Sequence, residues 1–135
     1  MPLITWSETY SVKLKELDAQ HQKLIALINE LFDAMSQGRG KEVIAGTLGG
    51  LIEYTRTHFA TEERLMSSSG YPGYLKHKGE HEAFTQKVTE FQGQYLSGQV
   101  ALTVQVMTFL KEWLTNHILG TDKKYVSFFI SKGII

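Results

Sequence analysis

Apolar residues recur at the spacing of an α-helix over most of the chain. The repeat runs through residues 18–37, 41 to about 66, about 74 to 95, and 100 to about 119, with apolar side chains at i, i+3, i+4 and i+7. Short stretches rich in glycine, serine or proline separate these runs, and such stretches favour turns. Asp18 is expected to cap the first helix, because a short polar side chain can accept a hydrogen bond from the helix N-terminus.

This pattern predicts an all-α fold. The β-branched residues are dispersed, and no sustained period-two alternation lies between hairpin turns. Because short loops between long helices make neighbouring helices antiparallel, we predict an antiparallel up-down-up-down four-helix bundle. The 135 residues, 42% of them hydrophobic, suffice for one buried core. We therefore predict one domain over residues 1–135, with an N-terminal arm (1–17) that packs through Trp6 and Tyr10, the bundle (18–119) and a short C-terminal helical segment (120–135).

The composition narrows the classes of partner and of chemistry. Fourteen basic residues balance fourteen acidic ones, so the sequence does not indicate the strongly positive surface that binds nucleic acid or anionic membranes. The chain has no cysteine, which excludes disulfides, thiolate metal sites and thiol nucleophiles. The start shows no basic stretch followed by an apolar one, and no uncharged run reaches membrane-spanning length. We expect a cytoplasmic protein that binds no nucleic acid and does not insert into membranes.

The positions of the five histidines are not random. His58 and Glu62 are four residues apart, as are His77 and His81, so each pair points in nearly one direction from its helix. Each of these residues continues the apolar stripe of its helix and therefore faces the core. The intervals between the histidines and the turns are 16 to 19 residues, or roughly 25 Å of helix each. The prediction is that all five meet at one end of the bundle: His21, His58, His77, His81 and His117.

Asp122 needs a special geometry to join this cluster. It lies five residues after His117, and in a continuous helix it would be rotated about 140° away. We expect the helix to break at Gly120, which suits a C-cap, and Thr121 to begin a new turn. Such a break would bring the carboxylate back toward the histidines.

A metal site explains this cluster better than packing or surface decoration. A single core histidine is usually structural, and an isolated His/Glu pair is more often on a helix surface. Burying five imidazoles and two carboxylates without a cation would cost many kcal/mol. Seven donors exceed the needs of one tetrahedral zinc, and imidazole with carboxylate suits iron. If Glu62, Asp122 and one solvent-derived oxygen bridge two ions, the histidines divide three and two, and one ion keeps a free position for a small neutral ligand such as dioxygen.

These positions also carry a family resemblance. The chain resembles the hemerythrin family, whose ligand pattern is H, then H-x-x-x-E, then H-x-x-x-H, then H-x-x-x-x-D. The resemblance spans essentially the whole chain, including Trp6 in the arm, and is strongest to single-domain bacterial members. All seven positions match, as His21 in LDAQHQKL, His58 and Glu62 in THFATEE, His77 and His81 in HKGEH, and His117 and Asp122 in NHILGTD.

The resemblance implies a cofactor of two iron ions with a bridging oxo or hydroxo group. Glu62 and Asp122 would bridge the ions; His77, His81 and His117 would hold the filled iron, and His21 and His58 the open one. The family's oxygen pocket would fall on Leu24, Phe59, Trp113, Leu114 and Ile118, although ordinary core packing would explain apolar residues at these positions equally well. Tyr125 would either lie near the centre or only pack beside it.

The implied function is reversible dioxygen binding for storage or delivery, without catalytic residues and without enzyme activity. An oxygen-consuming enzyme is a candidate recipient. The alternatives are an oxygen-sensing or partner-binding module, peroxidase or nitric-oxide chemistry at the free position, and a structural bundle with zinc or no metal. The sequence shows no fused signalling segment, which makes the sensing alternative less favoured than storage or delivery.

Overall fold

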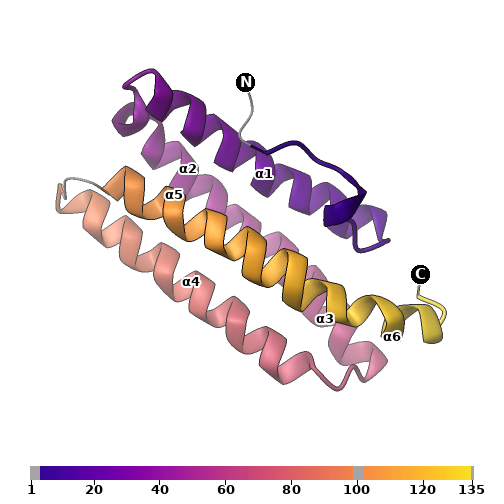
Figure 1. The fold of residues 1–135 in the computed structure, drawn as a ribbon. Helices are drawn as coiled ribbons and strands as arrows, with labels where there is room; N and C mark the ends of the chain where they lie inside the picture. The colour runs from indigo at the N-terminus through magenta and orange to yellow at the C-terminus, as the bar shows by residue number, and fades with distance from the viewer. Residues whose placement is uncertain (1–3, 99–101, 135) are drawn as a thin grey trace.

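Four helical rods lie side by side in the computed structural model of the chain, which describes residues 4–98 and 102–134 (Figure 1). Each rod packs against the next, and the last packs against the first, so the predicted all-α, up-down-up-down bundle is confirmed. The first rod is α1 (Lys15–Ser36) and the third is α4 (Tyr74–Leu96). The second rod joins α2 (Gly40–Tyr54), η2 (Thr55–Phe59) and α3 (Ala60–Ser69), and the fourth joins α5 (Leu102–Trp113), η3 (Leu114–Thr121), η4 (Asp122–Tyr125) and α6 (Val126–Ser131).

Glycines end the first three rods. Gly38, Gly70 and Gly98 have φ values of 73°, 75° and 76°, in the left-handed region that glycine adopts without steric cost. The predicted turns therefore lie where the sequence indicated. The predicted start of the last helix at Val100 lies outside the described residues.

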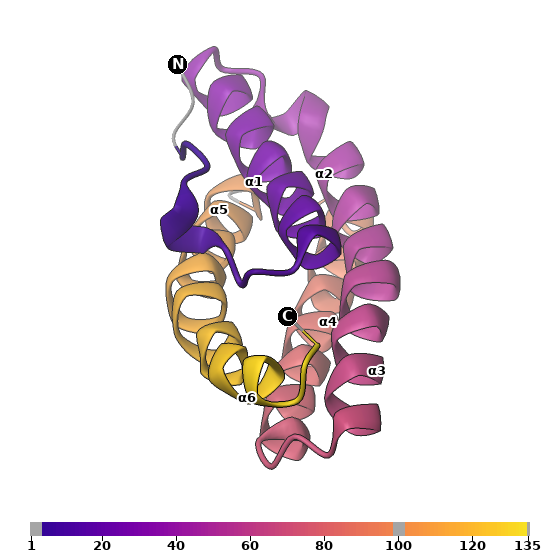
Figure 2. The same cartoon turned by 90° about the vertical axis from the view of Figure 1, so that its right-hand side faces the viewer.

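The N-terminal arm folds back along the bundle and ends in the first turn of α1 (Figure 2). Asp18 holds this return, because its carboxylate accepts hydrogen bonds from Ser11 Oγ at 2.6 Å and from the backbone N–H of Val12 at 2.8 Å. The prediction that Asp18 caps the helix is wrong: α1 already begins at Lys15, after Leu14. The pattern of apolar residues could not show that the arm, and not the helix N-terminus, supplies the donors for this carboxylate.

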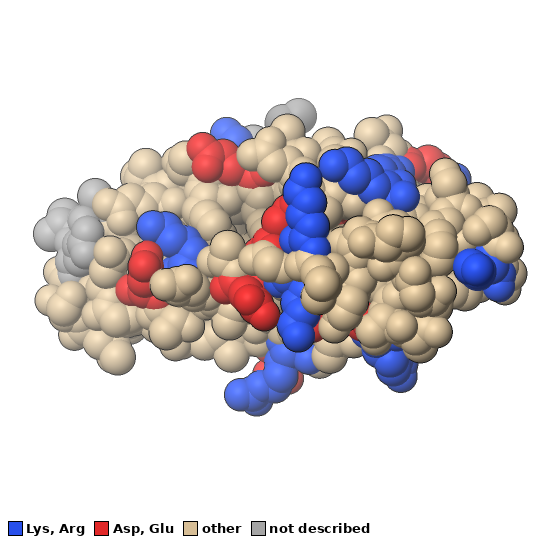
Figure 3. Space-filling model, turned by 90° about the horizontal axis from the view of Figure 1, so that it is seen from below, with Lys and Arg blue, Asp and Glu red and all other residues tan. Residues whose placement is uncertain are grey.

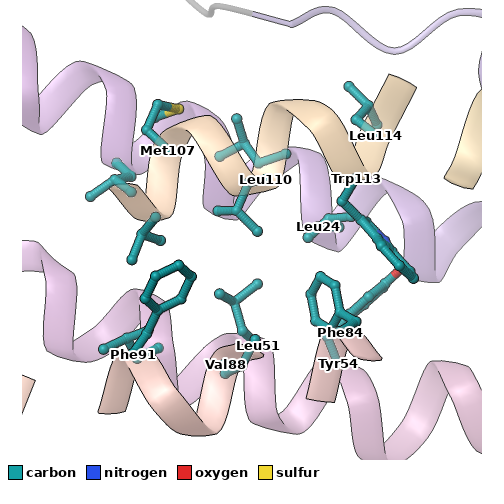
Figure 4. Close-up of a cluster of buried hydrophobic side chains, with 14 of the residues drawn as sticks. Leu24, Leu51, Tyr54, Phe84, Val88, Phe91, Met107, Leu110, Trp113 and Leu114 are labelled. Carbon is teal, nitrogen blue, oxygen red and sulfur yellow. The ribbon is translucent and has the colours of Figure 1, made fainter. Parts of the chain in front are cut away.

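Two apolar clusters enclose a polar layer in the bundle. The larger one fills most of the length of the rods, and Figure 4 shows side chains such as Leu51, Phe84 and Leu110 interdigitating there, each at most 1% exposed. Full burial of such a side chain contributes about 1.5–3 kcal/mol. The smaller cluster contains Val12, Leu17, Met66, Tyr125 and Phe129. Three rods pass from one cluster to the other through a polar position, at His21, Glu62 and Asp122.

None of the helices within residues 4–98 and 102–134 is long and apolar enough to cross a membrane. The division of the chain into arm, bundle and C-terminal segment within a single domain stays a prediction.

Candidate metal centre

The polar layer consists of seven buried side chains that the sequence had singled out. Each is at most 1% exposed, and together they come from all four rods. The structure brings all seven together: His21 from α1, His58 from η2, Glu62 from α3, His77 and His81 from α4, His117 from η3 and Asp122 from η4.

The backbone around His117 explains how Asp122 reaches the cluster. Residues Leu114–Thr121 form a π-helix, in which the backbone hydrogen bond spans five residues instead of four. Residues five apart therefore lie on nearly the same side, and Asp122 faces inward without a break. The predicted break with a C-cap at Gly120 is wrong, because the backbone stays helical through Thr121 (φ −63°, ψ −47°) and Asp122 (φ −63°, ψ −36°).

A second π-helical segment, Thr55–Phe59, carries His58. It shifts the register of the second rod, so that Tyr54 is buried at 5% exposure while Thr55 is only half-buried. Single-turn π segments in helices occur frequently at functional sites. Here both segments turn a histidine toward the same point.

The donor atoms form two overlapping groups that share both carboxylates. One group contains His77, His81 and His117 and the other His21 and His58, each with Glu62 and Asp122, and within a group the atoms lie no more than 4.8 Å apart. Oδ1 of Asp122 is 2.8 Å from Nε2 of His77 and 2.9 Å from Nε2 of His117, whereas Oδ2 is 3.1 Å from Nε2 of His21. Oε1 of Glu62 is 3.1 Å from Nε2 of both His58 and His81.

These short distances are not hydrogen bonds in geometry. The Nε2 atoms of all five histidines, Oε1 of Glu62 and both carboxylate oxygens of Asp122 are buried without a hydrogen-bond partner among the described residues. Buried polar atoms almost always have a partner, and cations between the converging atoms would supply one. Imidazole nitrogen and carboxylate oxygen are ligands that suit iron. The residues present therefore fit a pair of metal ions.

The charges of the metal-free chain are consistent with this interpretation. Burial disfavours the charged form of Glu62, but the imidazoles of His58, His77 and His81 outweigh it and hold the pKa of the carboxyl well below its ordinary value. Burial would lower the pKa of His77, yet Asp122 and Glu62 raise it to about 9. For Asp122, burial and Glu62 oppose ionisation, while His117 and His21 lower the pKa below its ordinary value. Both carboxylates are therefore ionised and offer two negative charges to a cation.

Known proteins contain the same domain. A family model described as the hemerythrin HHE cation binding domain matches residues 12–129. The chain belongs to the hemerythrin family. It is 34% identical over 126 residues to a bacteriohemerythrin of Pseudomonas aeruginosa (strain LESB58), covering 93% of this chain and 81% of the relative. A bacteriohemerythrin of Stenotrophomonas maltophilia (strain R551-3) is 32% identical over 125 residues, with 93% and 80% covered.

A solved structure gives the same result for the fold. The crystal structure of a hemerythrin mutant superposes with a TM-score of 0.83 at 29% identity, covering 94% of this chain and 97% of that one. The resemblance recognised in the sequence is thus confirmed at the level of the family and of the bundle.

In this member of the hemerythrin family, three histidines are oriented by polar residues on neighbouring helices. Nδ1 of His58 lies 2.6 Å from the amide oxygen of Gln20. Because an amide oxygen only accepts hydrogen bonds, Nδ1 donates and Nε2 keeps its lone pair for a metal. Carboxylates occupy the equivalent place for two further histidines: Glu63 Oε2 is 2.9 Å from Nδ1 of His81, and Glu80 Oε1 is 2.8 Å from Nδ1 of His117.

None of these three partners was predicted from the sequence, although they share a signal. Each precedes or follows another cluster residue in the chain: Gln20 precedes His21, Glu63 follows Glu62 and Glu80 precedes His81. A polar residue beside a buried histidine or glutamate lies at the edge of its helix face, where it reaches the adjacent helix. Nδ1 of His21 and Nδ1 of His77 have no partner among the described residues.

Aromatic rings cover four of the five histidines. Phe59 stacks on His81 with centroids 3.8 Å apart, and Trp113 stacks on His117 at 3.9 Å. Tyr54 stacks on His58 at 4.8 Å and Tyr125 on His77 at 5.7 Å. Neither tyrosine was assigned to the site from the sequence, although Tyr125 was considered. Burial, with the nearby carboxylates, raises the pKa of both phenols well above the ordinary value, so both keep their protons.

The residues expected to form the oxygen pocket are all part of the larger apolar cluster, beside the polar layer. Phe59 and Trp113 reach it through their stacking on histidines. The five histidines beside them are at most 1% exposed. The five pocket residues are Leu24, Phe59, Trp113, Leu114 and Ile118, at 0%, 4%, 9%, 5% and 0% exposure.

Proposed function

We propose that this chain binds dioxygen reversibly at a pair of iron ions, for storage or delivery. The observation that carries the proposal is the inequality of the two donor groups, which share both carboxylates but contain three imidazoles and two. His77, His81 and His117 would hold one ion and His21 and His58 the other, with Glu62 and Asp122 between them. With an oxo or hydroxo group added, the group of three histidines would leave no free position on its ion, and the group of two would leave one position for a small ligand.

The iron pair would supply the electrons for binding dioxygen and would recover them when dioxygen leaves. The chain supplies the rest. Its two ionised carboxylates neutralise much of the metal charge, and the hydrogen bonds at Nδ1 hold the imidazoles of His58, His81 and His117 in place. The five pocket residues exclude water from the free position, which favours release of oxygen over side reactions.

The relatives support this proposal, since two that are 32% and 34% identical to the chain are bacteriohemerythrins and the matching family model is described as cation binding. Acidic and basic side chains are mixed on the face seen in Figure 3, in keeping with the net charge of +0. The cytoplasmic location, the lack of a nucleic-acid partner and an oxygen-consuming enzyme as recipient stay predictions.

The test is an optical one. Protein reduced under argon should gain a visible absorption band when exposed to air, lose it when oxygen is removed, and repeat the cycle. A protein without such a band, or with a band that does not reverse, would end the proposal. The same sample should show no multiple turnovers with peroxide or nitric oxide and a reductant; sustained turnover would favour an enzyme.

A second candidate function, oxygen sensing, is favoured by the attachment of the arm beside the site. Lys123, next to Asp122, donates a hydrogen bond to the backbone carbonyl of Ser11, and Asp18 binds the same segment. A shift of Asp122 on ligand binding could therefore release the arm. Proteolysis of the arm that depends on oxygen would support sensing, and equal cleavage with and without oxygen would support storage.

A further inference from the structure

Tyr54 and Trp113 place two polar atoms inside an enclosure of aromatic rings. The Tyr54 side chain extends from the second rod toward Trp113 on the fourth (Figure 4). Phe84 lies 4.4 Å from Trp113 between ring centroids, and Phe59 lies 5.4 Å from Tyr54 and 5.7 Å from Trp113. The Tyr54 hydroxyl and Nε1 of Trp113 are both buried, and neither has a partner in good hydrogen-bond geometry among the described residues, although the indole lies close enough to the phenol to act on its pKa as a hydrogen-bond donor.

The two residues lie over the metal centre from its apolar side. Tyr54 stacks on His58, which belongs to the donor group with two histidines, and Trp113 stacks on His117, which belongs to the group with three. Both are part of the larger apolar cluster, which contains all five residues of the expected oxygen pocket, Trp113 among them. The unpartnered atoms therefore lie on the side where a small ligand would be enclosed.

The hydrogen-bond donors in this enclosure outnumber the acceptors. The indole N–H of Trp113 is a donor only, whereas the phenol of Tyr54 donates one hydrogen and accepts others. Even if the indole donates to the phenol oxygen, the hydroxyl hydrogen is left over. The rings of Phe59 and Phe84, which lie against both residues, offer no acceptor. Because buried donors rarely lack a partner and no residue within 4–98 and 102–134 supplies one, a ligand is the acceptor that this site calls for.

We propose that Tyr54 determines ligand specificity in the pocket, by donating a hydrogen bond to a small acceptor-bearing ligand, dioxygen or a small anion, held at the metal pair. This inference rests on the proposed function and adds to it a residue that an apolar pocket would not require. A hydrogen bond is stronger when its acceptor is charged and when it lies in a site of low polarity. Tyr54 thus favours ligands that carry or gain negative charge over neutral ligands without an accessible lone pair.

A water molecule is the rival acceptor. A groove of about 440 Å³ runs along the first and second rods and is lined by Tyr54, Gln20, Leu27 and Gly50, among others. Water from this groove that stayed bound to the hydroxyl would make Tyr54 a structural residue. The two cases differ in what removal of the hydroxyl changes: ligand binding in the first, and thermal stability alone in the second.

The experiment compares iron-loaded wild type, Tyr54→Phe and the matched control Tyr95→Phe, which removes a phenol oxygen from a side chain that is 41% exposed. Azide is the probe for anions. Tyr54→Phe should retain two irons per chain, bind azide about tenfold more weakly, which corresponds to about 1.4 kcal/mol, and release oxygen about tenfold faster. Its melting temperature without ligand should not fall, because the hydroxyl hydrogen has no acceptor in the unliganded protein. Tyr95→Phe should match wild type in all four measurements.

Azide affinity and oxygen release within twofold of wild type would overturn the inference, and a lowered melting temperature with unchanged ligand binding would assign the hydroxyl to water. Should the variant lose iron, a crystal structure of the iron-loaded wild type with azide decides. Azide within hydrogen-bond distance of the Tyr54 oxygen supports the inference, and water in that place contradicts it. Failure of the proposed function is separate, since it would appear as absence of iron or of reversible oxygen binding in the wild type.

Discussion

The Tyr125 hydroxyl donates a 2.6 Å hydrogen bond to Oε2 of Glu62, and both groups are completely buried. This bond connects the end of the fourth rod to the second rod. It also orients the carboxylate, because Oε2 faces the tyrosine while Oε1 faces the imidazoles of His58 and His81 at 3.1 Å. Tyr125, which belongs to the smaller apolar cluster, therefore positions a carboxylate that both donor groups share.

Tyr125→Phe should weaken metal binding while preserving the fold. Loss of the hydrogen bond leaves a buried carboxylate oxygen without its donor, which costs about 1–3 kcal/mol, and loss of such an orienting partner typically lowers metal affinity about 10- to 100-fold. The measurement is the rate at which a chelator removes iron. Tyr71→Phe, whose ring lies 6.4 Å from that of Tyr125 between centroids, is the control. Equal rates for wild type and Tyr125→Phe would refute the positioning role.

Replacement of Glu62 or His77 by alanine should reduce the iron content below two ions per chain. Glu62 belongs to both donor groups and His77 to one, so Glu62→Ala should lose more iron than His77→Ala. Metal analysis with circular dichroism as a fold check measures this. Glu82→Ala removes an exposed carboxylate next to His81 in the chain and should retain both ions. Two irons per chain in either site variant would contradict the ligand assignment.

Glu80 should stabilise the metal through His117. Its pKa is lowered, because the hydrogen bonds from His117 and Thr121 outweigh partial burial, which alone would raise it, and the carboxylate therefore accepts from Nδ1 at 2.8 Å. Glu80→Gln keeps an acceptor without the charge and Glu80→Ala keeps neither. The half-life of iron in the presence of a chelator should fall from wild type to Gln to Ala, by about 10- to 100-fold in total. Equal half-lives in the three proteins would exclude this role.

Leu114→Ala should change the passage of ligands more than the metal. Leu114 is 5% exposed, lies three residues before His117 in η3 and belongs to the larger apolar cluster, so its truncation should open space in that cluster and cost about 2–5 kcal/mol of stability. Oxygen binding and autoxidation should both become faster in stopped-flow and slow optical measurements. Leu48→Ala makes the same truncation in α2 at 1% exposure and serves as the control for stability alone. If both rates stay unchanged in Leu114→Ala, the residue does not line the pocket.

Periodicity accounts for most of the fold and for the choice of six of the seven site residues. Asp122 is the exception, because a continuous α-helix would rotate it about 140° away from His117. His58, Glu62, His77 and His81 share their faces through four-residue spacing, which depends only on helix geometry. The lengths between histidines and turns set the common level in the same way. Both the four-residue spacings and the lengths between histidines and turns can be read directly from the sequence.

What the sequence could not show depends on contacts between elements. The π-helical turns at Thr55–Phe59 and Leu114–Thr121 have no distinctive residue pattern. Their backbone geometry is poorer than that of an α-helix, and packing in the bundle stabilises it. Without a pattern that indicates a π-helix, Gly120 suggested a break in the helix. Asp18 resembled a cap until the arm supplied its donors, and Gln20 acts on a histidine 38 residues away.

The most direct test is a crystal structure of the iron-loaded protein with anomalous diffraction recorded at the iron absorption edge. The account predicts two anomalous peaks within the polar layer, one beside Nε2 of His77, His81 and His117 and one beside Nε2 of His21 and His58, with Glu62 and Asp122 next to both. A single peak, or iron bound elsewhere on the chain, would contradict it.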